Sequence, residues 1–284
     1  MSQVVPLDIG PVLQAYRDAA YNNAAAAPTG GALFARFAEE SKALRARFAA
    51  TMSLPYETRE RARLDLFPGS DPEAPCLVYL HGGYWQANNR EMFAVLGEGV
   101  AAHGWSVAIP GYSLAPDVGL RVIIGQIGAA LDWLTRHRRQ YGLSGPLIVA
   151  GSSAGGLMAA LSLAHPAVLA GISVSGIFEL APLRDTYLNV KLQLAGTEIR
   201  DLSPIRRPVI AKPFVVAYGS LELPAIIASA AGFSALRRAA GAPGPLIEIA
   251  EADHFSILNG LRDPDSDLTH AILELRSQME RTHD

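Results

Sequence analysis

Residues 147–156 read LIVAGSSAGG and carry the clearest structural signal in this chain. An apolar run at 147–150 leads directly into a Gly-x-Ser-x-Gly motif at 151–155, and an Ala- and Leu-rich segment follows. This order is typical of a buried strand that turns sharply into a helix, with the central residue strained and small residues on either side. A plain phosphate-binding turn is the alternative, but the spacings Gly-x-x-x-x-Gly-Lys and Gly-x-Gly-x-x-Gly are missing. We therefore predict that Ser153 is a nucleophile above the N-terminus of a helix.

The composition predicts a large apolar core and no attraction to polyanions. Of the 284 residues, 50% are hydrophobic and 18% are charged, and 24 basic against 27 acidic residues give a net charge of −3. Such a balance offers no basic footprint for nucleic acid. The single cysteine, Cys76, excludes an intrachain disulfide and a cysteine-based zinc site, and we expect it in the core.

No segment of the sequence predicts export or a membrane partner. Residues 1–6, MSQVVP, contain neither a basic stretch nor a long apolar run, so no signal peptide is expected. The most apolar stretch, 154–174, is interrupted by His165-Pro166, which favours a core helix followed by a core strand over a membrane span. We expect a cytoplasmic protein. Its low charged fraction is compatible with a homodimer face, and equally with a large core.

Short apolar runs bounded by turn residues alternate with helical patterns along the chain. The expected strands are 76–80, 105–109, 147–150, 171–174, 214–218 and 246–250. The expected helices are 120–141, 154–163, 225–240 and 268–279. Strands that are apolar throughout and alternate with helices predict an α/β fold with a mostly parallel, doubly wound sheet covered on both faces.

Three segments lie outside this alternation. Residues 31–50 place large apolar side chains at helical spacing, so we expect an N-terminal helical extension within 1–60. Residues 61–67 alternate and end at Pro68-Gly69, which predicts an exposed or edge strand. Residues 178–208 lack a clear period and predict a small cap-like insertion over the carboxyl edge of the sheet. The length is at the top of the single-domain range, and we treat 1–284 as one domain.

The loop after the strand at 76–80 predicts an oxyanion hole. It reads HGGYW at 81–85, and its glycines allow the backbone to approach a developing negative charge closely. We expect the N–H of Gly83, together with that of Gly82 or Tyr84, to act with the N–H of Ala154.

The other side chains of this loop have less specific interpretations. We expect the ring of His81 to brace the loop rather than to act in catalysis. Tyr84 and Trp85 are either core aromatics or walls of a substrate pocket beside the hole. We include both as candidate substrate-binding residues.

The base follows from the positions of the histidines. The chain has seven, and only His254 lies in a loop directly after a late strand. Enzymes with this strand–turn–helix motif order their triad as Ser, then acid, then His along the chain. His254 is therefore the expected general base.

The acid should follow the strand before the one that precedes the histidine. That strand is 214–218, and Glu222 lies in the loop after it, so Glu222 is our choice. Asp253 adjoins His254, and a sequence neighbour rarely reaches the imidazole Nδ1 of the next residue. Glu251 is the remaining alternative. A Glu at this place could also serve only as a helix first-turn acid that is favoured by the helix dipole.

These residues predict acyl transfer without a metal or an organic cofactor. Ser153 would attack an acyl carbon while neutral His254 accepts its proton, and Glu222 would hold the histidine tautomer. Water would then release the acyl group with the help of the same base.

Several motifs together resemble one known family. HGGYW at 81–85, Gly-x-Ser-Ala-Gly-Gly at 151–156 and DHFSIL at 253–258 are similar to the α/β-hydrolase type of arylformamidase, or kynurenine formamidase. Weaker likenesses are YNN at 21–23, Ser41 with Arg45, SGIFEL at 175–180 with LN at 188–189, and LSP at 202–204. The resemblance covers most of the chain and implies an α/β-hydrolase fold. The triad and hole are shared with the wider carboxylesterase and hormone-sensitive-lipase-like group.

The resemblance implies a serine hydrolase whose partner is a small-molecule amide or ester. One reading is an amidase or formamidase that cleaves a small acyl group from an aromatic amine, and an equal one is a carboxylesterase for short-chain or aryl esters. A non-catalytic binding protein is the third. Two departures weaken the inference to N-formylkynurenine: Ser152 stands where relatives often carry His or Asp, and Glu222 where many carry Asp.

Overall fold

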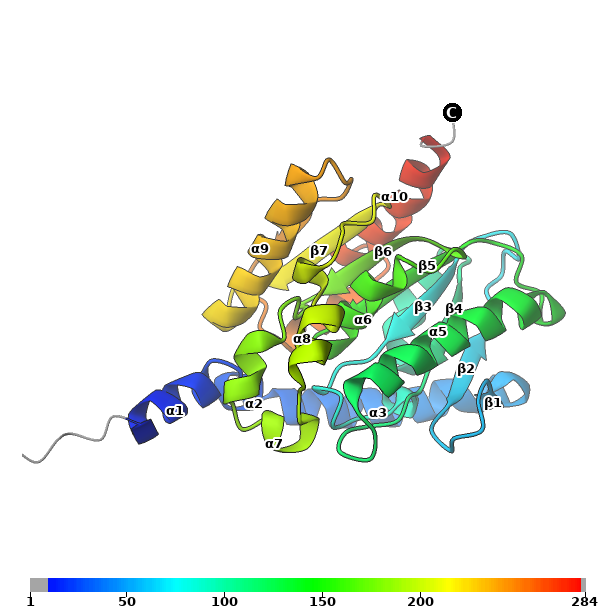
Figure 1. The fold of residues 1–284 in the computed structure, drawn as a ribbon. Helices are drawn as coiled ribbons and strands as arrows, with labels where there is room; N and C mark the ends of the chain where they lie inside the picture. The colour runs from blue at the N-terminus through cyan, green and yellow to red at the C-terminus, as the bar shows by residue number, and fades with distance from the viewer. Residues whose placement is uncertain (1–9, 282–284) are drawn as a thin grey trace, which may run out of the picture.

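An eight-stranded sheet forms the centre of the computed structural model, which describes residues 10–281 (Figure 1). The strands are β1 (Leu54–Pro55), β2 (Arg63–Phe67), β3 (Cys76–Leu80), β4 (Ser106–Pro110), β5 (Leu147–Ser152), β6 (Val168–Val174), β7 (Phe214–Gly219) and β8 (Leu246–Ile249). Their order is β1-β2-β4-β3-β5-β6-β7-β8. The pairs β1–β2 and β2–β4 are antiparallel and the others are parallel, which confirms the mostly parallel sheet. The prediction about residues 1–6 lies outside the described residues.

Helices cover both faces of this sheet. They are α1 (Gly10–Ala19), α2 (Asn23–Ala26), α3 (Gly30–Ala46), α4 (Glu98–Ala101), α5 (Leu120–His137), α6 (Ala154–Ser162), α7 (Asn189–Leu192), α8 (Gly196–Leu202), α9 (Pro224–Ala239) and α10 (Asp267–Arg281). Apolar side chains of α5, α6 and α9 belong to one core cluster, and those of α3, α4 and α10 to the other. In Figure 1, α5, α6 and α9 lie on one face of the sheet and α3 and α10 on the other. The sheet is therefore doubly wound, as the sequence predicted.

Helical periodicity explains how α5 attaches to the sheet. Ile123, Ile127, Leu131 and Leu134 recur at intervals of three or four and are at most 2% exposed. The predicted helix 120–141 ends as an α-helix at His137 and continues as a 3₁₀ turn to residue 141. Positive charge in this last turn suits the helix C-terminus.

The strand at the antiparallel edge corrects one prediction. We expected residues 61–67 to form an exposed or edge strand, but β1 pairs outside β2 and four of the five β2 residues are buried. The alternation arises because a charged residue, Asp65, is itself buried. Its carboxylate accepts hydrogen bonds from Arg45 at 2.7 Å, Arg90 at 3.2 Å and the Ser53 N–H at 2.8 Å. An ion-paired polar residue in the core therefore produced the pattern of a solvent-facing one.

Cys76 lies in the core at the start of β3, as predicted, and is 1% exposed. Its burial raises the pKa of the thiol to about 12, so that it stays protonated. The register joins Cys76 to Leu147 on β5. The same register aligns Leu80 with Gly151, so the two loops that follow these strands emerge together.

The N-terminal helices and the 178–208 segment meet at one end of the sheet (Figure 1). The Gln14 side chain donates to the Asp185 carbonyl at 3.0 Å, and the Tyr187 N–H donates to Asp18 at 2.7 Å. Segment 178–208 consists of short helical pieces, which include α7 and α8. Its contacts with the N-terminal helices place the two segments together beside the carboxyl edge of the sheet.

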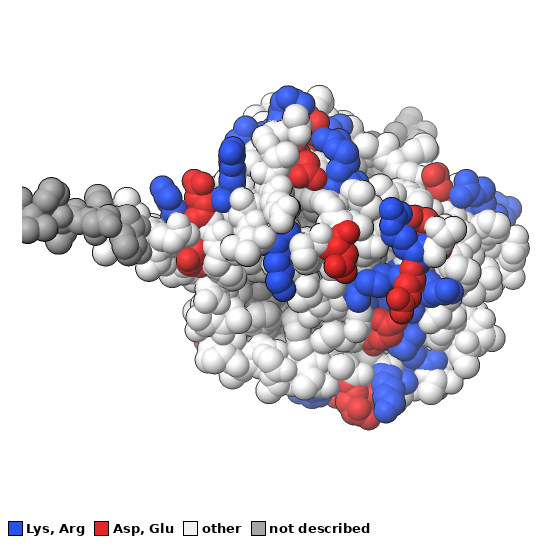
Figure 2. Space-filling view, turned by 60° about the horizontal axis from the view of Figure 1, so that its bottom comes forward, with Lys and Arg blue, Asp and Glu red and all other residues white. Residues whose placement is uncertain are grey.

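The surface carries charges of both signs. Figure 2 shows basic and acidic side chains interspersed on one face of the molecule, with uncharged surface between them. Within residues 10–281, no helix combines the length and the apolar character that crossing a bilayer requires.

Candidate active site

The tight turn after β5 holds Ser153 in a conformation that few non-glycine residues adopt. Ser153 has φ +53° and ψ −119° and directly precedes α6. Such a backbone costs about 1–3 kcal/mol and persists where its surroundings enforce it. A Cβ on Gly151 would lie 2.1 Å from the Gly155 carbonyl oxygen, and one on Gly155 would lie 1.9 Å from that of Leu80. Only glycines fit at these two positions, which explains the spacing of the motif.

The parallel register brings several loops to the edge at which Ser153 lies. Leu80 on β3 is level with Gly151 on β5, and Gly219 on β7 is level with Ile249 on β8. The carboxyl ends of parallel strands meet at one edge of the sheet. The loops after β3, β5, β7 and β8 therefore carry the four sets of residues that the sequence singled out.

Glu222 and His254 form a buried hydrogen-bonded pair. Oε2 of Glu222 lies 2.7 Å from Nδ1 of His254, and the Glu222 side chain is 0% exposed. Its other oxygen, Oε1, accepts from the Ser175 hydroxyl at 2.5 Å and from the Gly219 N–H at 2.9 Å. A carboxylate that accepts from three donors is held in one orientation and keeps the Nδ1 hydrogen of the imidazole directed toward it. Nε2 of the ring is then left as the acceptor.

One cavity brings His254 and Ser153 together. Both residues line a hollow of about 170 Å³, and they are 7% and 8% exposed. Glu222, and not Asp253 or Glu251, is the carboxylate that is hydrogen-bonded to Nδ1 of His254. Asp253 instead accepts from the N–H groups of Phe255 and Ser256 at 2.8 Å each and so shapes the histidine loop.

The predicted oxyanion loop also lines this cavity. Gly82 and Gly83 belong to its wall, and a Cβ on Gly82 would lie 3.0 Å from the Cβ of Ser153. The Gly82 carbonyl accepts from His81 Nδ1 at 2.8 Å and from Asn88 at 3.2 Å. Gly83 has φ +117°, a conformation that favours glycine. The loop backbone is thus fixed at close range to the candidate nucleophile.

Ala154 completes the set of backbone donors. It is the first residue of α6, and the first N–H groups of a helix have no partner within the helix. The N-terminus of a helix also favours negative charge through its dipole. The Ala154 N–H is therefore available to an anion beside Ser153.

His81 braces the loop, as the sequence led us to expect. The ring is stacked on Tyr112, with centroids 4.2 Å apart, and on Phe93, with centroids 5.7 Å apart. Complete burial lowers the pKa of His81 to about 4, so that the ring is neutral near pH 7. The Tyr112 hydroxyl donates to the His81 carbonyl at 2.7 Å and secures the loop from below.

Tyr84 and Trp85 take different places. Tyr84 lines the cavity, and its hydroxyl donates to the Tyr21 carbonyl at 2.7 Å. Trp85 is 0% exposed and packs in the core cluster with α5 and α6, and it is not among the cavity-lining residues. Of the two interpretations given for Trp85, its burial supports the core aromatic. Both residues have left-handed backbone angles, φ +50° and +58°, so the packing of the rings and not φ distinguishes them.

Sequence reasoning missed most of the cavity wall. Asn23, Ala24 and Phe34 of the N-terminal segment, Tyr187 of the 178–208 insertion, and Asn88, Phe93, Phe255 and Leu258 complete it. In this wall, the Phe34 ring makes edge-to-face contacts with Phe93 and with Phe255, and the ring centroids are 5.3 Å apart in each pair. The helical pattern of 31–50 predicted the helix that carries Phe34, but no local signal indicates which of its residues face the site.

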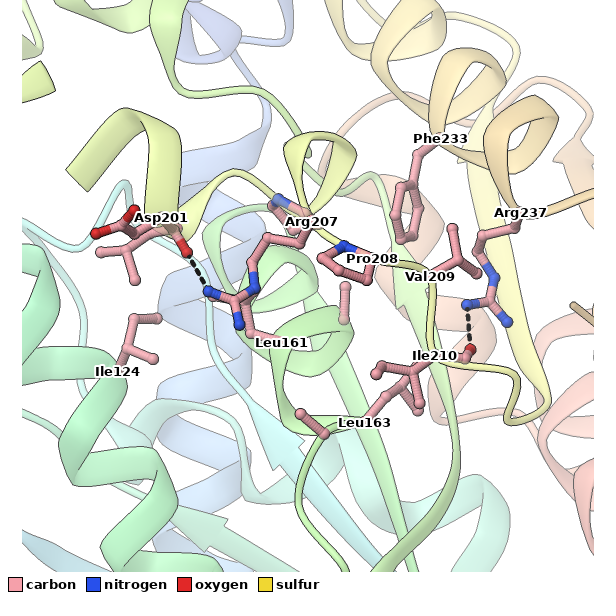
Figure 3. A pocket seen from close by; sticks show the side chains of 14 residues that line it. Ile124, Leu161, Leu163, Asp201, Arg207, Pro208, Val209, Ile210, Phe233 and Arg237 are labelled. Atoms are coloured by element: carbon pink, nitrogen blue, oxygen red, sulfur yellow. Dashed lines mark hydrogen bonds between the residues drawn. The ribbon is translucent and has the colours of Figure 1, made fainter. Parts of the chain in front are cut away.

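A larger cavity of about 250 Å³ lies between α5, α6, α9 and the end of the insertion (Figure 3). Arg237 at its border is buried, which lowers the pKa of its guanidinium to about 10. Its side chain donates to the carbonyl oxygens of Ile210, Lys212 and Pro243 at 3.2, 2.7 and 3.1 Å, and so ties neighbouring loops together. Among the described residues, no serine, cysteine or histidine lines this cavity, and its carboxylate Asp201 is ion-paired with Arg121 at 2.9 Å and Arg200 at 2.8 Å. This cavity therefore does not combine a serine with a histidine, and the hollow at Ser153 remains the candidate site.

The described residues contain no group of three or more His, Cys, Asp or Glu side chains that could hold a metal ion. The chemistry that the arrangement supports is that of its serine, imidazole, carboxylate and backbone N–H groups. A doubly wound sheet with such a serine on the turn after its central strand defines the class of α/β hydrolases.

Comparison with known proteins identifies the family. A family model described as alpha/beta hydrolase fold matches residues 77–255, and the chain belongs to this family. It is 28% identical over 240 residues to the kynurenine formamidase of Danio rerio. This match covers 79% of this chain and 81% of that protein. The kynurenine formamidase of Drosophila melanogaster is 23% identical and covers 69% of this chain and 71% of that protein.

Solved structures agree in fold. A crystal structure from Silicibacter sp. tm1040, provisionally assigned as a thioesterase, has a TM-score of 0.80 at 27% identity and covers 90% of this chain and 98% of that chain. Esterase B of Lactobacillus rhamnosis has a TM-score of 0.69 at 18% identity and covers 92% of this chain and 96% of that chain. The second likeness concerns the fold alone.

Proposed function

We propose that this protein is a serine hydrolase that cleaves a small acyl group from an aryl amide through an acyl-enzyme. The observation that carries the proposal is the hydrogen bond of 2.7 Å between Glu222 and Nδ1 of His254, in a cavity that His254 shares with Ser153. This bond leaves His254 Nε2 free of a proton and able to accept one. A nucleophile, an oriented base and an acid are the parts that acyl transfer needs.

The first half-reaction transfers the acyl group to the enzyme. Oγ of Ser153 attacks the carbonyl carbon, and its proton passes to Nε2 of His254. The carbonyl oxygen becomes an oxyanion, and the N–H groups of Gly82, Gly83 and Ala154 stabilise it. When the tetrahedral intermediate collapses, the imidazolium gives its proton to the leaving amine, and the bond between carbon and nitrogen breaks.

The second half-reaction returns the enzyme to its starting state. A water molecule gives its proton to His254 Nε2 and attacks the ester carbon of the acyl-enzyme. The oxyanion forms again at the same donors. Collapse then releases a carboxylic acid and returns the proton to Ser153.

The cavity favours a small, uncharged, aromatic substrate. It measures about 170 Å³, its wall includes Phe34, Phe93 and Phe255, and no Lys, Arg, Asp or Glu among residues 10–281 lines it. A buried ligand charge would have no partner there, which is costly. Similarity to kynurenine formamidases supports an arylformamidase-like reaction. The uncharged wall supports a simple formyl or short-acyl anilide over a substrate with a free amino-acid group.

A carboxylesterase acting on short-chain or aryl esters is the second candidate. The same residues would hydrolyse an ester, whose leaving alkoxide needs less protonation than an amine does. The apolar wall accommodates either type of leaving group.

Turnover by the purified protein tests the proposal. The panel is formanilide, N-formylkynurenine, and p-nitrophenyl esters from acetate to octanoate, with thermal unfolding as the check on folding. We expect formanilide to be cleaved, and Ser153→Ala to abolish turnover while the unfolding temperature is retained. Fast ester cleavage without anilide turnover would leave only the carboxylesterase, and an active Ser153→Ala variant would remove the serine mechanism.

A further inference from the structure

Among the described residues of the cavity wall, one fully buried side-chain atom has no hydrogen-bond partner. Asn23 lines the cavity and is 4% exposed, and its Oδ1 atom is buried without a donor. A buried unsatisfied acceptor costs about 1–3 kcal/mol. Native structures tolerate few such groups, and one in a ligand cavity requires a functional reason.

A hydrogen-bond chain fixes the orientation of the Asn23 amide. The Tyr84 hydroxyl donates its only hydrogen to the Tyr21 carbonyl at 2.7 Å, because a carbonyl can only accept. The oxygen of that hydroxyl is therefore an acceptor, and Asn23 Nδ2 donates to it at 3.0 Å. Burial raises the pKa of Tyr84 well above its ordinary value, which keeps the hydrogen in place. The Asn23 amide cannot flip without breaking this chain, so its Oδ1 is held free.

Two other polar side chains of the cavity wall make hydrogen bonds within the protein. The Ser152 hydroxyl is bonded to that of Tyr79 at 2.8 Å, and the Asn88 amide donates to the Gly82 carbonyl at 3.2 Å. Of the buried partnerless side-chain atoms in the described residues, those outside Asn23 belong to residues that do not line the cavity. Among the described residues of the wall, Asn23 Oδ1 is thus the fully buried side-chain acceptor that is left without a donor.

We infer that Asn23 accepts a hydrogen bond from the N–H of the scissile amide and so makes the enzyme selective for aryl amides over the matching esters; this inference rests on the function proposed above. In the tetrahedral intermediate the amide nitrogen has one lone pair, which must face the imidazolium Nε2–H to receive the proton. Its N–H then points elsewhere and needs an acceptor. An ester has oxygen at this position and no hydrogen to donate, so Asn23 gives it no assistance.

A matched pair of substrates tests the inference. Formanilide and phenyl formate differ only in N–H against oxygen at the leaving atom, and the uncatalysed rate of each is subtracted. The measured quantity is kcat/KM for formanilide divided by kcat/KM for phenyl formate. It is determined in wild type, Asn23→Leu and Asn23→Ala. We expect both variants to lower the ratio about tenfold, mainly through the kcat for formanilide, because the bond forms in the transition state. A tenfold change equals about 1.4 kcal/mol, the size of one hydrogen bond.

Asn22→Ser, at the residue before α2, provides the control, because serine keeps a side-chain oxygen that can cap the helix. The Asn22 side chain accepts from the Ala25 N–H at 3.1 Å and caps α2, and Asn22 is not among the cavity-lining residues. Its variant should leave the ratio unchanged. An equal loss for both substrates in the Asn23 variants, or an unchanged ratio, would overturn the inference and leave Asn23 a packing role. A wild-type enzyme that cleaves neither substrate would instead refute the proposed function itself.

Discussion

Replacement of Glu222 by Gln tests the orientation of the catalytic imidazole. Oε1 of Glu222 accepts from the Gly219 N–H at 2.9 Å, and a backbone N–H can only donate. The oxygen of a glutamine must therefore stay at that position, which turns its NH₂ group toward His254. Nδ1 of His254 then becomes an acceptor, and the ring hydrogen moves to Nε2. In that tautomer Nε2 cannot take the proton of Ser153.

The expected loss is large because the wrong tautomer removes the base. The equivalent carboxylate-to-amide change in a serine protease triad lowers kcat about 10⁴-fold, and we expect a similar loss here. This corresponds to about 5.4 kcal/mol at 1.36 kcal/mol per decade. Folding should survive, because the Gln side chain keeps the bond from Gly219 and nearly the same volume.

The assay is kcat with formanilide and with p-nitrophenyl acetate, together with ¹⁵N NMR of labelled histidine to locate the ring hydrogen. Glu248→Gln is the matched control. Glu248 is exposed on β8, and its side chain accepts a hydrogen bond of 2.7 Å from the Tyr218 hydroxyl. The control should keep wild-type kcat. A Glu222→Gln variant that retains kcat within about tenfold, with the hydrogen still on Nδ1, would refute this reasoning.

Two further predictions concern stability. Asp65→Ala should destabilise the fold by about 3 kcal/mol in urea unfolding, because it removes the buried carboxylate that accepts from Arg45, Arg90 and the Ser53 N–H. Glu57→Ala, at a side chain that is 26% exposed, should change the free energy of unfolding by less than about 0.5 kcal/mol, and equal effects would contradict this reasoning. Folding lowers the pKa of His81 from 6.5 to about 4. Between pH 6.5 and 4, His81 is therefore protonated in the unfolded chain and neutral in the folded chain. Stability should therefore decrease by about 3 kcal/mol between pH 6.5 and 4, and a wild type with the same slope as His81→Gln over this range would exclude that cause.

Local sequence patterns account for the parts of the structure that are governed by near neighbours. The turn at Ser153 depends on close approach among residues 151–155, and the α5 stripe depends on helical spacing. The position of Glu222 and His254 after successive late strands was enough to select them. Each of these features is fixed by a few consecutive residues or by chain order along a parallel sheet.

Burial and long-range pairing escaped the local pattern in two places. Asp65 looked solvent-facing, yet its partners Arg45 and Arg90 come from segments that pack on it only in the folded chain. The sequence left Trp85 open as a core aromatic or a pocket wall beside Tyr84, and only packing in the folded chain places it in the core. A polar side chain or an aromatic ring has no fixed environment until the elements around it are assembled.

The amino-acid sequence by itself determined the sheet class, the strained serine and the candidate base and acid, because sterics and strand order impose their positions locally. The tertiary structure alone decided what surrounds them. Asn23 meets Tyr84 across 61 positions of the chain, and Tyr187 joins the same wall from the insertion. Which substrate the cavity accepts depends on these distant contacts, since a pocket is formed by packing and not by any one segment.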